Sequence, residues 1–117
     1  MAFNVEFQDK DGNIIDFNRI DSEVCELWKV DSDENDWATP PGKDYSDNWH
    51  EFLGYTVMLT RAYKETGTFL PSELLQGLCS FGCMYPKLES IDKYKYELQL
   101  IFYWIKKGYK IVVTNRW

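Results

Sequence analysis

The spacing of apolar residues predicts strands at both ends of the chain. In residues 3–8 apolar and polar side chains alternate, and this period of two is typical of a strand with one buried face. Turn-forming residues around Gly12 follow, and the apolar pattern then resumes, so that residues 3–17 predict a β-hairpin. Residues 109–114 are rich in β-branched side chains and predict a third strand.

Four intervening segments carry apolar residues at intervals of three and four, which is the spacing of an amphipathic helix. Gly67 is expected to end the second of these helices, and Gly108, after a basic last turn, is expected to end the fourth. The candidate N-caps or first residues of the four helices are Asp21 or Ser22, Ser46 or Asn48, Pro71, and Ser90.

These elements predict an α+β protein. A chain of 117 residues has the size of one folding unit, so we expect a single domain over residues 1–117. A lone C-terminal strand would leave costly unpaired backbone groups unless it joined an existing sheet. We therefore expect it to pair with the N-terminal hairpin, which gives a three-stranded antiparallel sheet packed against about four helices.

The net charge of −6 is unevenly distributed along the chain. Residues 1–51 carry a charge of −10, and residues 52–117 carry +4. Such asymmetry concerns partners rather than fold, and it argues against nucleic-acid binding by the domain as a whole. A local nucleic-acid contact would have to use the basic side chains of the second half, which include Lys93, Lys95, Lys106, Lys107, Lys110 and Arg116. The two halves could also meet between two copies of the chain, which leaves a homodimer as an alternative.

The cysteine content is that of a protein from a reducing compartment. Three cysteines, an odd number without the spacing of a disulfide framework, predict reduced thiols. The first residues lack the features of a secretory signal, and no apolar stretch approaches the roughly 18 residues that cross a bilayer. We therefore expect a soluble, cytoplasmic protein that does not associate with membranes.

Candidate catalytic and metal-ligating residues are few. His50 is the only histidine, and the cysteines are Cys25, Cys79 and Cys83, so a zinc site would need all four side chains from across the chain. The sequence contains no phosphate-binding glycine loop, no serine-hydrolase elbow and no His-Glu-x-x-His motif. We expect no catalytic residue, no metal and no cofactor. The alternative is a small enzyme or ligand-binding domain whose pocket contains His50 and a cysteine.

Residues 31–44 predict an exposed acidic loop. Four acids precede Trp37, and two prolines block helix formation after it. Carboxylates in this loop would steer a basic partner, and an aromatic side chain would supply desolvated contact area. In the alternative, Trp37 folds back onto the domain and the acids are solvated. We expect an interaction protein that binds another protein through Asp31, Asp33, Glu34, Asp36, Trp37, Asp44 and Trp49.

Part of the chain resembles a group of small uncharacterised proteins of bacteriophages and prophages. The resemblance covers residues 25–55 and consists of four short features, namely Leu27-Trp28, Thr39-Pro40-Pro41, Asn48-Trp49 and Gly54-Tyr55. Short acidic proteins of this kind commonly act by binding host or viral proteins. The resemblance implies a non-enzymatic accessory protein of a mobile element, and it assigns no role to individual residues.

Overall fold

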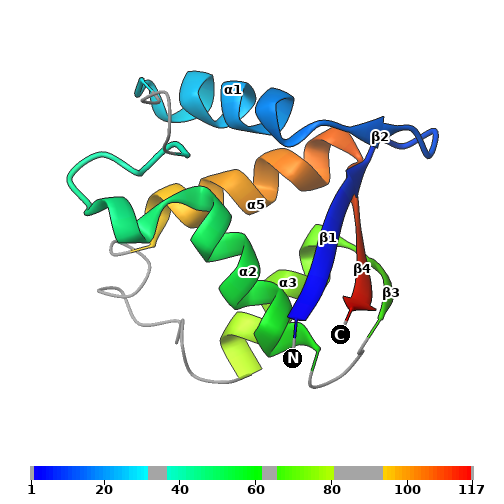
Figure 1. The fold of residues 1–117 in the computed structure, drawn as a ribbon. Helices are drawn as coiled ribbons and strands as arrows, with labels where there is room; N and C mark the ends of the chain where they lie inside the picture. Colours follow the sequence, from blue (N-terminus) through cyan, green and yellow to red (C-terminus); the bar gives the residue numbers. More distant parts are fainter. Residues whose placement is uncertain (1, 32–36, 62–65, 81–93, 117) are drawn as a thin grey trace.

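A four-stranded antiparallel sheet forms one side of the molecule. The computed structural model describes residues 2–31, 37–61, 66–80 and 94–116. Within these residues the strand order is β2-β1-β4-β3, and the helices lie to one side of the central pair (Figure 1). The strands are β1 (Ala2–Gln8), β2 (Ile14–Ile15), β3 (Gly67–Phe69) and β4 (Lys110–Arg116).

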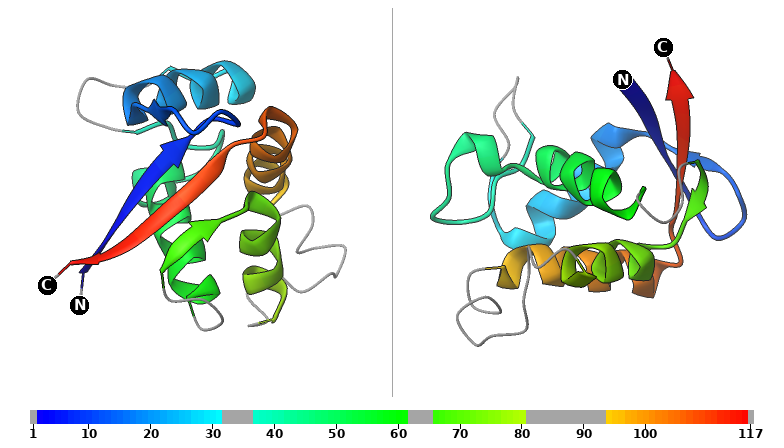
Figure 2. Two further views of the ribbon diagram at one scale, coloured as in Figure 1. Left: turned by 90° about the vertical axis from the view of Figure 1, so that its right-hand side faces the viewer. Right: turned by 90° about the horizontal axis from the view of Figure 1, so that it is seen from below.

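The predicted pairing of the C-terminal strand with the N-terminal hairpin is confirmed. β1 lies antiparallel to both β2 and β4, and Figure 2 shows β1 and β4 side by side with the two termini close together. In the register of this pair, Phe7 lies opposite Ile111 and Val5 opposite Val113. Phe7, Ile111 and Val113 are fully buried, because the alternation of the strands turns these side chains toward the helices.

Four α-helices and one 3-10 helix cover the sheet within the described residues. They are α1 (Phe17–Trp28), α2 (Trp49–Thr60), α3 (Pro71–Ser80), α5 (Lys95–Lys107) and the 3-10 helix η1 (Tyr45–Asp47). Of the two predicted caps, Ser46 and Asn48, it is Asn48 that caps α2, since its side chain accepts a hydrogen bond from the Glu51 backbone N–H at 2.8 Å. Pro71 begins α3, and Gly108 ends α5 in the left-handed conformation, also as predicted. Ser90 lies outside the described residues.

The sheet has one strand more than the three predicted. β3 pairs with the side of β4 that faces away from β1, and Phe69 of this strand lies opposite Ile111 and is buried. Three residues are too few to show a period of two, so the sequence pattern does not reveal this strand. The expected helix end at Gly67 is wrong, because α2 ends at Thr60. Gly67 instead begins β3 with a φ of 109°, which glycine adopts without strain.

α1 begins earlier than the sequence pattern predicts. Its N-cap is Asp16, whose side chain accepts a hydrogen bond from the Asn18 backbone N–H at 2.7 Å, and not Asp21 or Ser22. The early start allows Ile20 to join the buried stripe of the helix. Asp21 therefore lies inside the helix, where its carboxylate is available for a tertiary contact.

The Asp21 carboxylate ties α1 to the segment that precedes α2. Its Oδ1 accepts hydrogen bonds from the Ala38 backbone N–H at 2.7 Å and from the Trp49 indole Nε1–H at 2.8 Å. The Trp49 backbone N–H in turn donates to the Ala38 carbonyl at 3.0 Å, so that Asp21, Ala38 and Trp49 are all linked by hydrogen bonds. Because Ala38 and Trp49 are buried, water cannot readily replace Asp21 as the acceptor. The intervening segment, which includes η1, is thereby fixed in place.

Replacing Asp21 with alanine should destabilise the protein. Asp21→Ala leaves the Ala38 and Trp49 N–H groups buried without their acceptor, so the free energy of unfolding should fall by roughly 2–5 kcal/mol. Urea denaturation followed by tryptophan fluorescence measures this change. Glu26→Ala, at an exposed position of the same helix, is the matched control and should cost less than about 0.5 kcal/mol. Equal stability of the two variants would contradict the role assigned to Asp21.

A second carboxylate of α1 binds two tyrosine hydroxyls. Tyr103 of α5 and Tyr109, which precedes β4, each donate to Glu23 Oε2 at 2.7 Å. Burial, together with the hydrogen bond to the Glu23 carboxylate, raises the pKa of both phenols, that of Tyr109 from 10.0 to about 12. α1, α5 and the start of β4 are therefore joined at Glu23.

Stability should fall in strongly alkaline solution. Because the pKa of Tyr109 is raised in the folded state, the unfolded chain loses this proton first as the pH rises from 10.0 to about 12. The stabilising contribution of Tyr109 is therefore complete below pH 10.0 and is lost across this window. Tyr109→Phe should make the decline shallower when chemical denaturation is measured at a series of pH values. A pH profile identical to that of the wild-type protein would contradict the buried, hydrogen-bonded state of this hydroxyl.

Candidate functional site

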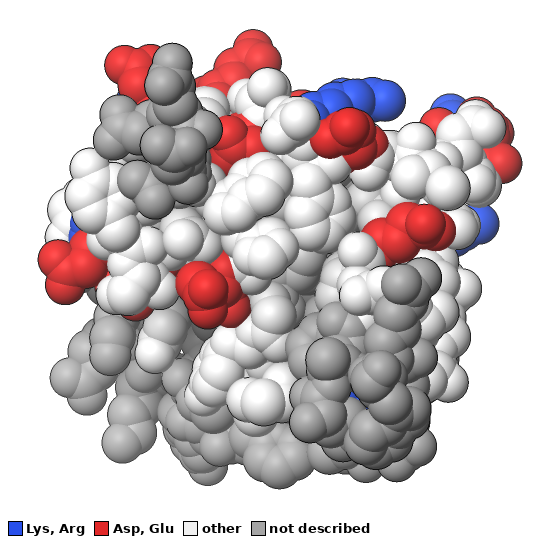
Figure 3. Space-filling view, viewed as in Figure 1, with Lys and Arg blue, Asp and Glu red and all other residues white. Residues whose placement is uncertain are grey.

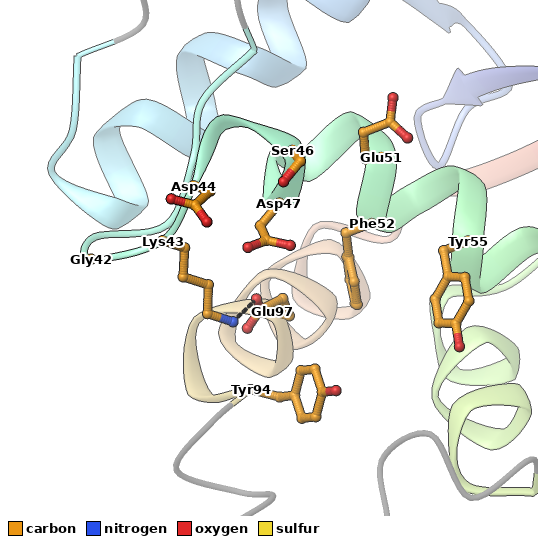
Figure 4. Close-up of a pocket in the computed structure, with 10 residues that line it drawn as sticks. All are labelled: Gly42, Lys43, Asp44, Ser46, Asp47, Glu51, Phe52, Tyr55, Tyr94 and Glu97. Carbon is orange, nitrogen blue, oxygen red and sulfur yellow. Dashed lines mark hydrogen bonds and ion pairs between the residues drawn. The ribbon is translucent and has the colours of Figure 1, made fainter.

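A cleft of about 690 Å³ opens between the segment that carries η1 and the start of α5 (Figure 4). This volume is in the range of pockets that bind small molecules. Among the described lining residues four are acidic, three are aromatic and one is basic, a composition suited to a cationic group. These residues are Gly42, Lys43, Asp44, Ser46, Asp47, Glu51, Phe52, Tyr55, Tyr94 and Glu97.

One wall of the cleft comes from η1 and α2. Glu51 and Tyr55 lie four residues apart on one face of α2, and Asp47 comes from η1 before it; all three line the cleft. Asp44, Asp47 and Glu51 are exposed. Figure 3 shows acidic side chains in several separate places on the face that carries α1 and α2, with basic side chains mainly toward the hairpin. The described part of this face thus carries several separate negative charges.

A buried ion pair lies in the cleft. Glu97, in the first turn of α5, is 4% exposed, and its Oε1 accepts a hydrogen bond from Lys43 Nζ. Lys43 Nζ also lies 5.3 Å from the centre of the Tyr94 ring, which is a cation–π contact. The second carboxylate oxygen, Glu97 Oε2, is buried and has no hydrogen-bond partner among the described residues. A buried carboxylate oxygen without a hydrogen-bond donor is energetically costly.

A tight turn delivers Lys43 to this position. Gly42 adopts a φ of 79°, and the Lys43 backbone N–H donates to the Pro40 carbonyl at 3.2 Å. The turn directs the Lys43 side chain toward Glu97 on α5 (Figure 4). The two sides of the cleft are thus joined by one side chain from a loop.

The acidic loop predicted as the binding site is described only in part. Asp33, Glu34 and Asp36 lie outside the described residues, and Asp31 next to them is exposed. Of the described members of the predicted set, Asp44 alone lines the cleft.

Both tryptophans of the predicted set pack into the domain. Trp49 is fully buried and makes edge-to-face contacts with Phe7 and Trp104, so it is not available to a partner, and its assignment to a contact surface is corrected. Trp37 is half-buried and stacks on His50, with ring centres 5.2 Å apart and planes at 16°. This packing agrees with the alternative in which Trp37 folds back onto the domain.

His50 lies beside a separate, smaller cavity. This cavity has a volume of about 230 Å³, and its described lining residues are Val5, Phe17, His50, Glu51, Leu53 and Gly54. The set contains no cysteine. Cys25 Sγ instead donates to Asp21 Oδ2 at 3.8 Å, while Cys83 and the side chain of Cys79 lie outside the described residues. The described part of the chain therefore gives no geometric support to a pocket shared by His50 and Cys25.

Among the described residues, no group of three or more His, Cys, Asp or Glu side chains is arranged to hold a metal ion. In the same part of the chain, no helix has both the length and the apolar character needed to cross a bilayer.

Comparison with protein-family models, with curated proteins and with solved structures gives no match. The resemblance of residues 25–55 to phage and prophage proteins therefore stays a prediction. Conclusions about function rest on the cleft and on the residues that line it.

Proposed function

We propose that this chain is a non-enzymatic interaction protein whose acidic cleft binds a basic segment of another protein. The observation behind this proposal is the lining of the cleft, whose described residues include four carboxylates and three aromatic rings but a single lysine. Carboxylates attract and orient basic side chains, and aromatic rings supply contact area that excludes water. The kind of partner is the one expected from the sequence. The proposed contact surface moves from the acidic loop and its neighbouring tryptophans to the cleft, and Asp44 belongs to both surfaces.

Exposed aromatic and apolar side chains also lie on the two elements that form one wall of the cleft. Tyr55 and Met58 lie three residues apart on the outer side of α2, and Tyr45 belongs to η1. All three are large side chains with much of their surface exposed to solvent. Tyrosine and methionine are enriched at protein interfaces, so these side chains would add apolar contact area to a partner bound on this side of the molecule.

The acids from Asp31 to Asp36 would then act at longer range. In this proposal they add to the negative potential that attracts a basic partner, without direct contact. An accessory role in a phage or prophage belongs to the same proposal, and only the sequence resemblance supports it.

A basic peptide tests the binding function of the cleft. The probe is a short fluorescently labelled peptide in which arginine alternates with serine, and a glutamate–serine peptide is the charge-reversed control. We expect the basic peptide to bind, and Asp44→Asn/Asp47→Asn to weaken binding roughly tenfold, because each exposed charge contributes up to about 1 kcal/mol. Fluorescence anisotropy measures the affinity.

A matched double variant separates the cleft from overall charge. Asp11→Asn/Glu26→Gln removes the same two charges from exposed positions that do not line the cleft, and it should change the affinity less than about twofold. Equal weakening by both double variants would show that the peptide responds to net charge alone. That result would overturn the assignment of binding to the cleft.

A loop variant tests the surface predicted from the sequence. Neutralising the four loop acids should reduce both the association rate and its dependence on salt, while the complex, once formed, should dissociate at the wild-type rate. Stopped-flow mixing with the same peptide measures both rates. Faster dissociation from this variant would place the loop in direct contact with the partner. The substitutions are Asp31→Asn, Asp33→Asn, Glu34→Gln and Asp36→Asn.

A further inference from the structure

Glu97 presents a buried carboxylate that the chain satisfies on one side only. Its side chain is 5% exposed, and Oε1 pairs with Lys43. Oε2 has no hydrogen-bond partner among the described residues and belongs to a side chain that lines the cleft. Carboxylates buried to this degree normally have both oxygens hydrogen-bonded. The unpaired oxygen therefore points to a donor that arrives with a ligand.

Lys43 matches this carboxylate incompletely. Its ammonium is a compact charge on a flexible stem, and it reaches one of the two carboxylate oxygens. The Lys43 side chain is 22% exposed and comes from the turn at Gly42, not from a helix. Rotation of this side chain into solvent would thus leave α2 and α5 undisturbed. Lys43 therefore supplies a positive charge next to Glu97 but leaves the Oε2 atom without a hydrogen bond.

A guanidinium group would fill the same position. Its planar fork donates two parallel N–H bonds to a carboxylate, which would satisfy Oε1 and Oε2 together. It is more weakly hydrated than an ammonium, so its transfer into the cleft costs less. The Tyr94 ring, already 5.3 Å from Lys43 Nζ, offers a face on which a guanidinium stacks.

We infer, on the basis of the proposed function, that the cleft is an arginine-binding site in which an arginine of the partner protein displaces Lys43 and pairs with both oxygens of Glu97. Lys43 then turns outward into solvent. Asp44 and Asp47, at the exposed side of the cleft, contact basic residues next to that arginine. This inference restricts the class of partner from basic proteins in general to proteins that present an arginine side chain.

Lys43→Arg gives the sharpest test. This variant keeps the net charge and every acid of the cleft, but it supplies the guanidinium from within the chain. The internal arginine should occupy Glu97 and weaken binding of the arginine–serine peptide about tenfold or more, while raising the thermal unfolding temperature. If the peptide responded only to the overall charge of the protein, Lys43→Arg would leave its affinity unchanged. Unchanged peptide affinity in Lys43→Arg would overturn the displacement of Lys43.

Three matched peptides test the chemistry of the ligand on the wild-type protein. They alternate serine with arginine, with lysine or with citrulline, which has the shape of arginine without its charge. We expect the arginine peptide to bind about tenfold more tightly than the lysine peptide, and the citrulline peptide not to bind. Glu97→Gln should weaken the arginine peptide by about thirtyfold or more and remove the preference over lysine. Circular dichroism shows whether Glu97→Gln is folded, and the ranking on the wild-type protein does not depend on that variant.

The possible results separate this inference from the proposed function. Equal affinities for the arginine and lysine peptides, both weakened by Asp44→Asn/Asp47→Asn, would overturn the arginine site and leave the proposed function standing. Absence of binding by every basic peptide would overturn both. A preference for arginine that is lost in Lys43→Arg supports both.

Discussion

The carboxylate of Asp21 is the contact on which the arrangement of the cleft depends. It accepts hydrogen bonds from a backbone N–H and from an indole N–H that lie at the two ends of residues 38–49. Those residues have little regular structure of their own, because η1 is only three residues long. Fixing their ends against α1 sets the path that brings Lys43 and the acids of η1 in front of α5. Trp49 adds a second constraint, since its ring fills the core between Phe7 and Trp104.

Local signals in the sequence account for the parts of the fold that could be predicted. The alternation in β1, the cap at Asn48 and the glycine after α5 are each defined by a few neighbouring residues, and the structure confirms them. β3 could not be predicted, because its three residues carry no periodic pattern and it forms only by pairing with β4. The start of α1 was misplaced because Asp16 and Asp21 are both good caps by residue type. Only the tertiary structure shows that Asp21 is used elsewhere.

The cleft was less accessible to sequence reasoning than the fold. The acidic character of the region could be predicted, and Asp44 was among the expected binding residues. The four-residue spacing of Glu51 and Tyr55 on α2 was a usable signal for one wall. Nothing local connects this wall with Glu97, because the contact to α5 spans a long stretch of chain and depends on the turn before η1. Trp37 and Trp49 were assigned to the contact surface because they are aromatic and lie near acids in the sequence. A large aromatic ring in that position can equally well be buried in the core, and the sequence does not distinguish the two cases.

The pairing of β1 with β4 has a consequence for how the molecule is made. Phe7 meets Ile111 in the centre of the sheet, and every helix is translated between them. A ribosome therefore releases β1 long before its main partner exists, and the apolar face of that strand stays uncovered during synthesis of the helices. Contacts among neighbouring helices are closer in sequence and can form on the nascent chain, whereas the sheet must wait until β4 has left the exit tunnel. Until that moment the aromatic core is accessible to chaperones.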